Sequence, residues 1–319
     1  MIKNGYASWL YYEEILGRKS KYKAFWWSPD SKQIAYMRFD DSNVPVFPIY
    51  IPDGQHGYLE KERYPKAGDP NPTVKIGIVT IGNEATTWTD FDTTVDKYFG
   101  EPYWSPGSEL IVQWMNREQD SLLLYHINKS NGQKTLIYTE TQPTWITLDE
   151  DERFYFLSGN NGFILKSDKD GWENLYLYDL NGKLLSQLTN GNFWNTGVLA
   201  VDEKGKQVYF KSRKENSARF DVYKASFNGN NVVRLSFGNY SHDEVQMSPA
   251  GKYFITSYSN LTSPPAMALV DNKGKIVRQL GNVKGPDFDN YQLAQPKLTT
   301  VKSSDNAFGL RVSTTYPLN

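Results

Sequence analysis

Two adjacent carboxylates, Glu13 and Glu14, lie within the aromatic and aliphatic run Trp9–Leu16 near the start of the chain. Neighbouring carboxylates repel each other, so beside apolar side chains both stay ionised only when water or a cation compensates their charge. A free α-amino group is such a cation, because it is charged at neutral pH and donates three hydrogen bonds to carboxylate oxygens. The pair is thus suited to binding the amino terminus of a peptide. The alternative is a solvated helix end, where the helix dipole alone favours two acids in the first turn.

The residues around the pair follow a specific order. Trp9 and Tyr11 precede it, and four further blocks follow: Trp26-Trp27-Ser28-Pro29-Asp30, Asp40-Asp41-Ser42-Asn43-Val44-Pro45-Val46, Tyr64-Pro65-Lys66-Ala67-Gly68 and Asn71-Pro72-Thr73-Val74-Lys75. Together these blocks resemble the dipeptidyl peptidase IV family. That family comprises serine exopeptidases with a β-propeller in front of an α/β-hydrolase domain.

The resemblance implies a role for the acid pair in substrate binding. Glu13 and Glu14 would hold the free amino terminus of a peptide substrate and position its second peptide bond over a serine of the hydrolase domain. Trp9 and Tyr11 would pack to hold this segment without contacting the substrate. A blocked terminus would leave two desolvated carboxylates without a counter-cation, which accounts for selectivity for free amino ends.

The chain carries no recognisable catalytic or metal-binding motif. A serine hydrolase of this family needs Gly-x-Ser-x-Gly followed by Asp and His, and this string does not occur, while His56, His126 and His242 belong to no such motif. The strings Asp90-Phe91-Asp92 and Asp287-Phe288-Asp289 lack the glycine and terminal glutamate of a calcium loop. We therefore assign no catalytic residue, metal or cofactor; only the resemblance implies an enzyme, a serine-type dipeptidyl peptidase whose Ser/Asp/His domain this chain lacks.

Composition excludes several classes of function. The net charge of the 319 residues is −1, so nothing provides the basic surface that nucleic acid requires. No apolar run reaches the roughly 18 residues that a membrane-spanning helix needs. Cysteine is absent, which excludes disulfides, and aromatic residues make up 15% of the chain, a composition that favours strands.

A pattern recurs five times along the chain. Each copy has an aromatic or apolar pair, then Ser-Pro or Asp, a turn and an alternating strand. The landmark residues lie 77, 43, 53 and 47 residues apart: Ser28, Ser105, Leu148, Val201 and Ser248. The strands expected after them are Gln33–Arg38, Leu110–Trp114, Phe154–Leu157, Val208–Lys211 and Tyr253–Ser257.

A second hairpin with an Asn/Gly turn follows each copy, and this turn is the strongest short hairpin signal. Two hairpins in a period of about 45 residues make one propeller blade. We predict an all-β fold, a β-propeller of about five four-stranded, WD40-like blades. The resemblance makes these the C-terminal part of an eight-bladed propeller. Tandem sandwich-like units remain an alternative that the short, even period disfavours.

Two segments depart from the repeat. Residues 44–72 contain several prolines, which remove the backbone donors of a central strand, so we expect an extended arm. Its apolar residues Phe47, Ile49 and Tyr50 favour a docking surface over a floppy loop, and the resemblance implies a homodimer contact there. We predict the propeller over residues 1–295, and over 296–319 a hairpin leading to a hydrolase domain that is missing from this chain.

The function that the sequence favours is the substrate-binding propeller portion of a dipeptidyl peptidase IV-like exopeptidase. Its expected partners are a peptide with a free amino terminus and the hydrolase domain of the same protein. The resemblance implies a cell-envelope, periplasmic or extracellular location. The alternatives are a freestanding propeller that binds proteins or peptides without catalysis, and a carbohydrate-active propeller with a carboxylate pair in its funnel.

Overall fold

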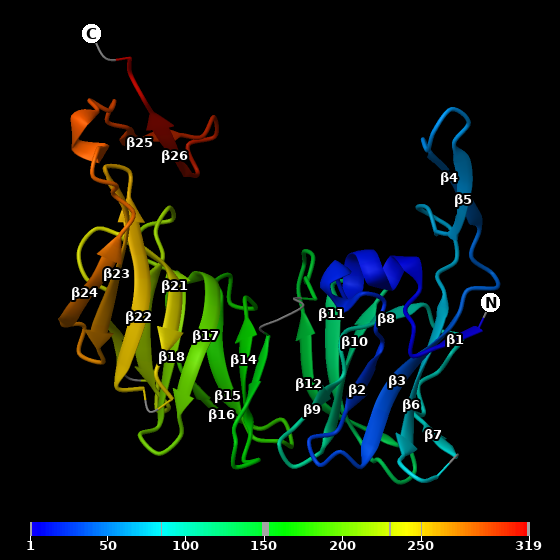
Figure 1. Cartoon of the computed structure of the whole chain (residues 1–319). Helices are drawn as coiled ribbons and strands as arrows, with labels where there is room; N and C mark the ends of the chain where they lie inside the picture. The colour runs from blue at the N-terminus through cyan, green and yellow to red at the C-terminus, as the bar shows by residue number, and fades with distance from the viewer. Residues whose placement is uncertain (1, 84, 149–152, 230, 250, 318–319) are drawn as a thin grey trace. The chain divides into compact units, whose positions relative to one another are not determined.

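The computed structural model describes residues 2–83, 85–148, 153–229, 231–249 and 251–317, and its regular secondary structure is almost entirely antiparallel β-sheet (Figure 1). It divides into two compact units. Unit 1 comprises Met1–Phe163 with Tyr178–Lys183, and unit 2 comprises Ile164–Leu177 with Leu184–Asn319.

Five antiparallel sheets follow one another along the chain. The first contains β1 (Ile2–Asn4), β2 (Phe25–Trp27), β3 (Gln33–Asp40), β6 (Thr73–Thr80) and β7 (Thr86–Trp88). The second contains β8 (Lys97–Phe99), β9 (Tyr103–Trp104), β10 (Leu110–Asn116), β11 (Ser121–Ile127) and β12 (Lys134–Thr141).

The other three sheets have four strands each, paired in sequence order. The third contains β13 (Phe154–Phe156), β14 (Phe163–Ser167), β15 (Asn174–Tyr178) and β16 (Leu184–Gln187). The fourth contains β17 (Trp194–Asp202), β18 (Gln207–Arg213), β19 (Asp221–Ser226) and β20 (Val232–Arg234). The fifth contains β21 (Ser241–Met247), β22 (Tyr253–Asn260), β23 (Ser263–Asp271) and β24 (Ile276–Asn282). The all-β prediction is confirmed, and each of the five expected strands lies within β3, β10, β13, β18 or β22 to within a residue.

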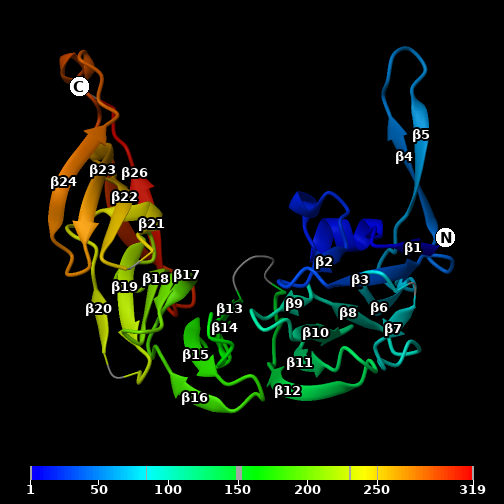
Figure 2. The same cartoon turned by 60° about the horizontal axis from the view of Figure 1, so that its bottom comes forward.

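Two separate hairpins lie outside these sheets. The arm is β4 (Val46–Ile51) paired with β5 (Tyr58–Arg63), and it projects beyond the sheet of β3 and β6 (Figure 2). The terminal hairpin is β25 (Lys297–Lys302) paired with β26 (Gly309–Thr314). Three short helical turns complete the described elements: η1 (Tyr11–Ile15), η2 (Arg18–Ser20) and η3 (Phe288–Asn290).

The recurrent serine closes the first turn of three sheets. The Ser28 hydroxyl accepts the Gln33 N–H at 2.9 Å. Ser105 accepts the Glu109 N–H at 3.1 Å, and Ser248 accepts the Tyr253 N–H at 3.1 Å. The hydroxyl thus satisfies a donor that the tight turn would leave unpaired, which is the physical basis of the repeated Ser-Pro.

The repeated glycine of the second hairpin has a different role, because it is where each sheet meets the one before it. A Cβ at Gly132 would overlap the carbonyl of Trp88 in β7, and a Cβ at Gly182 would overlap that of Ile137 in β12. Gly229 meets the carbonyl of Gln187, and Gly274 that of Leu235, just after β20. All four have positive φ, between 73° and 87°, so glycine is required both by conformation and by the close approach.

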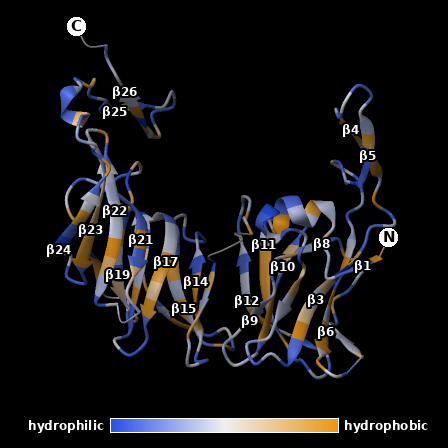
Figure 3. Cartoon of the chain, in the orientation of Figure 1, coloured by the Kyte–Doolittle hydropathy of each residue, from blue (hydrophilic) through white to orange (hydrophobic). Residues whose placement is uncertain are grey.

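Hydrophobic residues are concentrated on the strands, as the hydropathy colouring of Figure 3 shows, and the buried ones form cores between neighbouring sheets. In unit 1 one core joins η1 to the first two sheets through Tyr11, Ile15, Phe39 and Phe99. In unit 2 another core, which includes the buried Phe254, joins the fourth and fifth sheets. Burial on both faces explains why β10 and β15 carry near-continuous apolar runs.

Replacing Gly182 by Ala tests the glycine contact. The left-handed φ alone costs an alanine about 1–2 kcal/mol, and the overlap with the Ile137 carbonyl should add about 1–3 kcal/mol. Gly82→Ala is the matched control, since Gly82 has φ +82° and no neighbouring heavy atom within 4 Å among the described residues. Urea denaturation should therefore show a clearly larger loss for Gly182→Ala; equal losses would contradict the contact.

Acid should destabilise unit 2 through His242, which is fully buried. Its Nε2 donates to the Phe237 carbonyl at 3.0 Å, and Nδ1 lies 3.2 Å from the Thr256 hydroxyl. Burial lowers the pKa of His242 below its usual 6.5, with Arg234 and Arg219 lowering it further and the Phe237 carbonyl and Asp221 opposing. The unfolded chain then binds this proton first, so stability falls as pH drops below about 6.5.

The urea midpoint at pH 7.5 and pH 5.5 measures this effect. The wild-type chain should lose stability on acidification, and the loss should shrink in His242→Gln. His126→Gln is the control, because His126 is partly exposed beside Glu109. An unchanged pH dependence in His242→Gln would show that the buried imidazole is not the titrating group.

Candidate functional site

The acid pair lies on η1, a single π-helical turn. The Leu16 N–H donates to the Tyr11 carbonyl at 2.7 Å, and the Tyr12 N–H donates to the Ser8 carbonyl at 3.0 Å. Such wide turns are rare and are often found at functional sites. Glu13 is partly buried and Glu14 is exposed, so the solvated helix end describes Glu14 better than Glu13.

Tyr11 fixes η1 to the sheets beneath it. Its hydroxyl accepts the N–H of Phe99 in β8 at 3.0 Å, and its ring packs edge-on to Phe39 in β3 with 4.9 Å between centroids. Burial raises the pKa of Tyr11 above its usual value, so the phenol stays neutral. The expectation that Tyr11 is a packing residue is confirmed, and the structure adds a hydrogen bond that joins η1 to the second sheet.

An aromatic stack supports the other side of the turn. The rings of Tyr12 and Tyr22 are stacked 3.8 Å apart, and Tyr6 stacks on Tyr22 at 4.9 Å. Trp9 packs edge-on to Tyr12 at 6.3 Å, in agreement with its expected packing role. Burial raises the pKa of Tyr22 to about 12. Sequence reasoning missed this stack, whose members come from both sides of the acid pair.

A strained backbone conformation at Lys21 and Tyr22 accompanies the position of Tyr22 in the stack. Lys21 and Tyr22 have φ of 50° and 63°, left-handed values that cost non-glycine residues about 1–3 kcal/mol each. Strain of this kind persists only where the surroundings impose it. The loop after η1 is therefore folded back against η1 and held there by the Tyr12–Tyr22 stack.

Arg18 is the second feature that the sequence analysis missed. Its Nη2 lies 2.6 Å from Oε2 of Glu13, with the arginine side chain 72% exposed and the glutamate side chain 16% exposed. The Glu13 carboxylate raises the pKa of Arg18. Among the described residues, Glu14 has no hydrogen bond or ion pair. The only available signal was the cationic sequence Arg18–Lys23 directly after the acids.

The histidines have structural neighbours. His126 Nε2 lies 2.7 Å from Oε2 of Glu109, and His242 is buried against Phe237 and Thr256. His56 is exposed on the arm. Within the described part of the chain, no histidine is hydrogen-bonded to a serine. No group of three or more His, Cys, Asp or Glu residues there is arranged to hold a metal.

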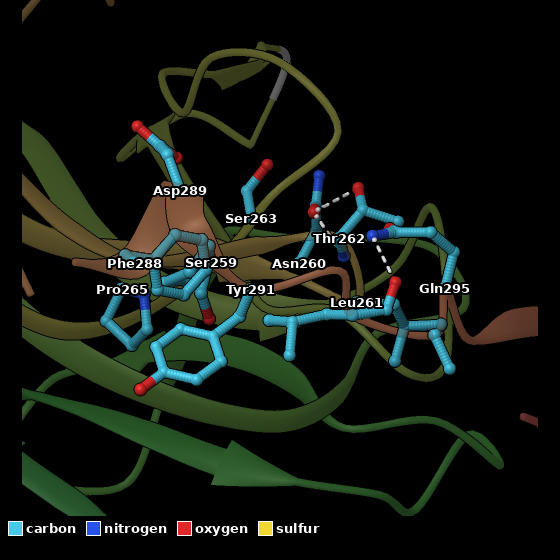
Figure 4. A pocket seen from close by; sticks show the side chains of 13 residues that line it. Ser259, Asn260, Leu261, Thr262, Ser263, Pro265, Phe288, Asp289, Tyr291 and Gln295 are labelled. Carbon is cyan, nitrogen blue, oxygen red and sulfur yellow. Dashed lines mark hydrogen bonds between the residues drawn. The ribbon is translucent and has the colours of Figure 1, made fainter. Parts of the chain in front are cut away.

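Among the described residues of unit 2, side chains line a larger and a smaller groove. The larger has a volume of about 680 Å³ and is lined by residues that include Arg219, Asn239 and Leu298. Figure 4 shows the smaller, of about 380 Å³, in which Asn260 accepts two hydrogen bonds from Thr262. Neither groove is lined by Glu13 or Glu14, and Asp289 is the one carboxylate among their lining residues. The acid pair therefore stays the better candidate site for a positively charged ligand.

Comparison with known proteins gives a consistent result. Residues 1–265 match the family described as "Dipeptidyl peptidase IV (DPP IV) N-terminal region". The chain belongs to the dipeptidyl peptidase IV family. The resemblance inferred from the sequence is thereby confirmed.

Relatives extend the match over most of the chain. Dipeptidyl peptidase 4 of Trichophyton equinum is 31% identical over 325 residues, which cover 94% of this chain and 41% of the relative. The crystal structure of Porphyromonas gingivalis dipeptidyl peptidase 4 aligns with a TM-score of 0.83 at 26% identity, covering 98% of this chain and 44% of that one.

A mouse relative named inactive dipeptidyl peptidase 10 is 27% identical over 275 residues, covering 80% of this chain and 34% of its own. The chain thus spans less than half the length of the dipeptidyl peptidase IV relatives that it matches. No helix in the described ranges is long and apolar enough to cross a membrane.

Tyr11→Phe tests the anchoring of η1. The Phe99 N–H would lose its acceptor while fully buried, and an unsatisfied buried donor costs about 1–3 kcal/mol. Tyr36→Phe is the matched control, because the Tyr36 hydroxyl bonds the Thr86 hydroxyl in a partly exposed place where water can substitute. If both variants lose the same stability in denaturant titrations, the Tyr11 bond does not hold the turn.

Proposed function

We propose that this chain is the substrate-binding propeller portion of a dipeptidyl peptidase IV-like serine exopeptidase that removes dipeptides from free amino termini. The observation that carries the proposal is the position of Glu13 and Glu14. They lie side by side on a turn whose buried Tyr11 is hydrogen-bonded to the second sheet and packs against the first, within the segment that matches the family.

The chemistry of the pair suits an α-ammonium group. Two carboxylates offer more acceptor positions than its three donors require, and charge-assisted bonds of this kind are roughly twice as strong as neutral ones. Because η1 is fixed by Tyr11, the carboxylates need little reorganisation to bind. The peptide would be oriented by its amino end, so this chain contributes positioning and not bond breaking.

The finer fold proposal is a partial propeller. Five successive sheets with the same glycine contact between neighbours are what repeated blades require. In the first sheet the equivalent Gly82 has open space around it among the described residues, although its φ of +82° matches the others. This supports a further sheet docking there, as in the C-terminal part of an eight-bladed propeller. The hairpin β25–β26 would lead from residues 296–319 into a hydrolase domain.

The remaining partner proposal concerns the arm. Tyr50, Tyr58 and Leu59 are 60%, 54% and 57% exposed, an apolar surface on a two-stranded hairpin that has little stability alone. A homodimer contact through this arm would cover it. The family membership supports a location in the cell envelope, in the periplasm or outside the cell.

A second candidate function is peptide or protein binding without catalysis. It is favoured by the similarity to a relative whose name declares it inactive. Hydrolysis of Xaa-Pro-anilides by the protein isolated from its native cells would exclude this candidate.

We call Glu13 and Glu14 the anchor. Amine-dependent peptide binding tests this anchor in the 319-residue chain. Alanyl-prolinamide should bind and shift the side-chain carboxyl ¹³C signals of labelled Glu13 and Glu14 in NMR titrations, whereas its N-acetylated form should not. Glu13→Gln and Glu14→Gln each remove a charged acceptor, and charged hydrogen bonds contribute about 1.5–3 kcal/mol, so we expect Kd to rise about ten-fold or more.

Glu244→Gln is the matched control, because Glu244 is exposed in unit 2 and its loss changes the net charge equally. Binding that survives in Glu13→Gln and Glu14→Gln, or that is equal for the acetylated peptide, would contradict the anchor.

A further inference from the structure

The anchor already holds a cation of its own. Arg18 Nη2 lies 2.6 Å from Glu13 Oε2, closer than any other charged group recorded for this carboxylate in the described chain. A guanidinium and an ammonium seek the same oxygens of a carboxylate. Any peptide amino terminus that reaches Glu13 must therefore displace Arg18 or share the carboxylate with it.

We propose that Arg18 is a specificity-determining residue, a built-in competitor that the substrate's α-ammonium displaces from Glu13. The inference rests on the proposed function of the acid pair. It goes beyond that function by giving the two glutamates different roles. Glu14 receives the incoming ammonium, and Glu13 contributes fully only after the guanidinium has moved away.

The backbone around Arg18 keeps the competitor in place. Gly17 has φ +69°, and the turn that follows is closed by bonds from the Ser20 N–H to the Gly17 carbonyl at 3.0 Å and from the Lys21 N–H to the Arg18 carbonyl at 3.2 Å. The stack of Tyr22 on Tyr12 ties the end of this loop back to η1. The guanidinium is therefore delivered to Glu13 by a local, folded loop.

The exposure of the two partners makes the pair displaceable. The Arg18 side chain is 72% exposed, so on leaving Glu13 it returns to water at little cost, whereas Glu13 is only 16% exposed and needs a replacement cation. Ion pairs of exposed residues are weak, so competition from Arg18 should weaken the binding of a peptide amino terminus only a few-fold. Two carboxylates and one guanidinium also leave a net charge of −1 at the anchor, half that of the acids alone.

This arrangement discriminates between ligands by the charge of their amino terminus. A neutral, acetylated terminus cannot replace the guanidinium, so Arg18 keeps Glu13 satisfied and the ligand gains nothing there. A free ammonium binds Glu14 directly, and it binds Glu13 by replacing the Arg18 guanidinium. The free protein also avoids an unpaired, partly buried carboxylate.

Arg18→Gln tests the inference in the 319-residue chain, with alanyl-prolinamide as the probe and its N-acetylated form as the blocked ligand. In the NMR titration described above, Arg18→Gln should lower Kd for the free-amine peptide about two- to five-fold. Arg18→Lys keeps the charge and should stay close to wild type. Lys21→Gln is the matched control, because Lys21 is an exposed cation of the same loop and does not contact Glu13.

A double-mutant cycle separates competition from a general charge effect. In a Glu13→Gln background the guanidinium has no carboxylate to occupy, so adding Arg18→Gln should no longer tighten binding. Tightening that persists in that background, or that Lys21→Gln reproduces, would overturn the role of Arg18.

The outcomes distinguish this inference from the proposed function. Amine-dependent binding by the wild type, with Arg18→Gln unchanged or weaker, would refute the competitor and leave the anchor intact. If the wild type shows no amine-dependent binding at all, the anchor fails and the competitor with it.

Discussion

Close approach of a hairpin turn to the carbonyl of the preceding sheet is the constraint on which the fold depends. It occurs at Gly132, Gly182, Gly229 and Gly274, and at each position a Cβ would collide with backbone. Backbone cannot move aside as a flexible side chain can, so the spacing between neighbouring sheets is set by the absence of a side chain. The apolar cores then fill a gap whose width the turns have already determined.

The candidate site lies on the first two of these sheets. The π-helical turn is not stable on its own, because five residues make too few internal hydrogen bonds. Tyr11 supplies what is missing by bonding the backbone of β8 while its ring packs on Phe39 of β3. The acids are thereby held over a rigid base, which is the condition for orienting a ligand by one end.

The electrostatics of the site are asymmetric although the two acids are identical in type. Glu13 is partly buried and paired with Arg18, whereas Glu14 is exposed. The difference comes from the turn that begins at Gly17, with φ +69°, and brings Arg18 against Glu13 but not against Glu14. A family likeness to dipeptidyl peptidase IV identifies the segment, but the local packing decides how each carboxylate is satisfied before a ligand arrives.

The sequence by itself determined the family, the all-β class, the positions of the strands and the acid pair. These follow from local signals: alternation of apolar residues, Ser-Pro and Asn/Gly turns, and short blocks of ordered motif. Tertiary structure alone decided that Gly182 meets Ile137, that Tyr11 bonds Phe99, and that Tyr6, Tyr22 and Tyr12 stack. Such contacts join residues from different turns and sheets, and no periodicity records them. The Arg18–Glu13 pair is close in sequence, yet no pattern revealed it, because the contact requires the turn at Gly17 (φ +69°) to bring the guanidinium back toward η1.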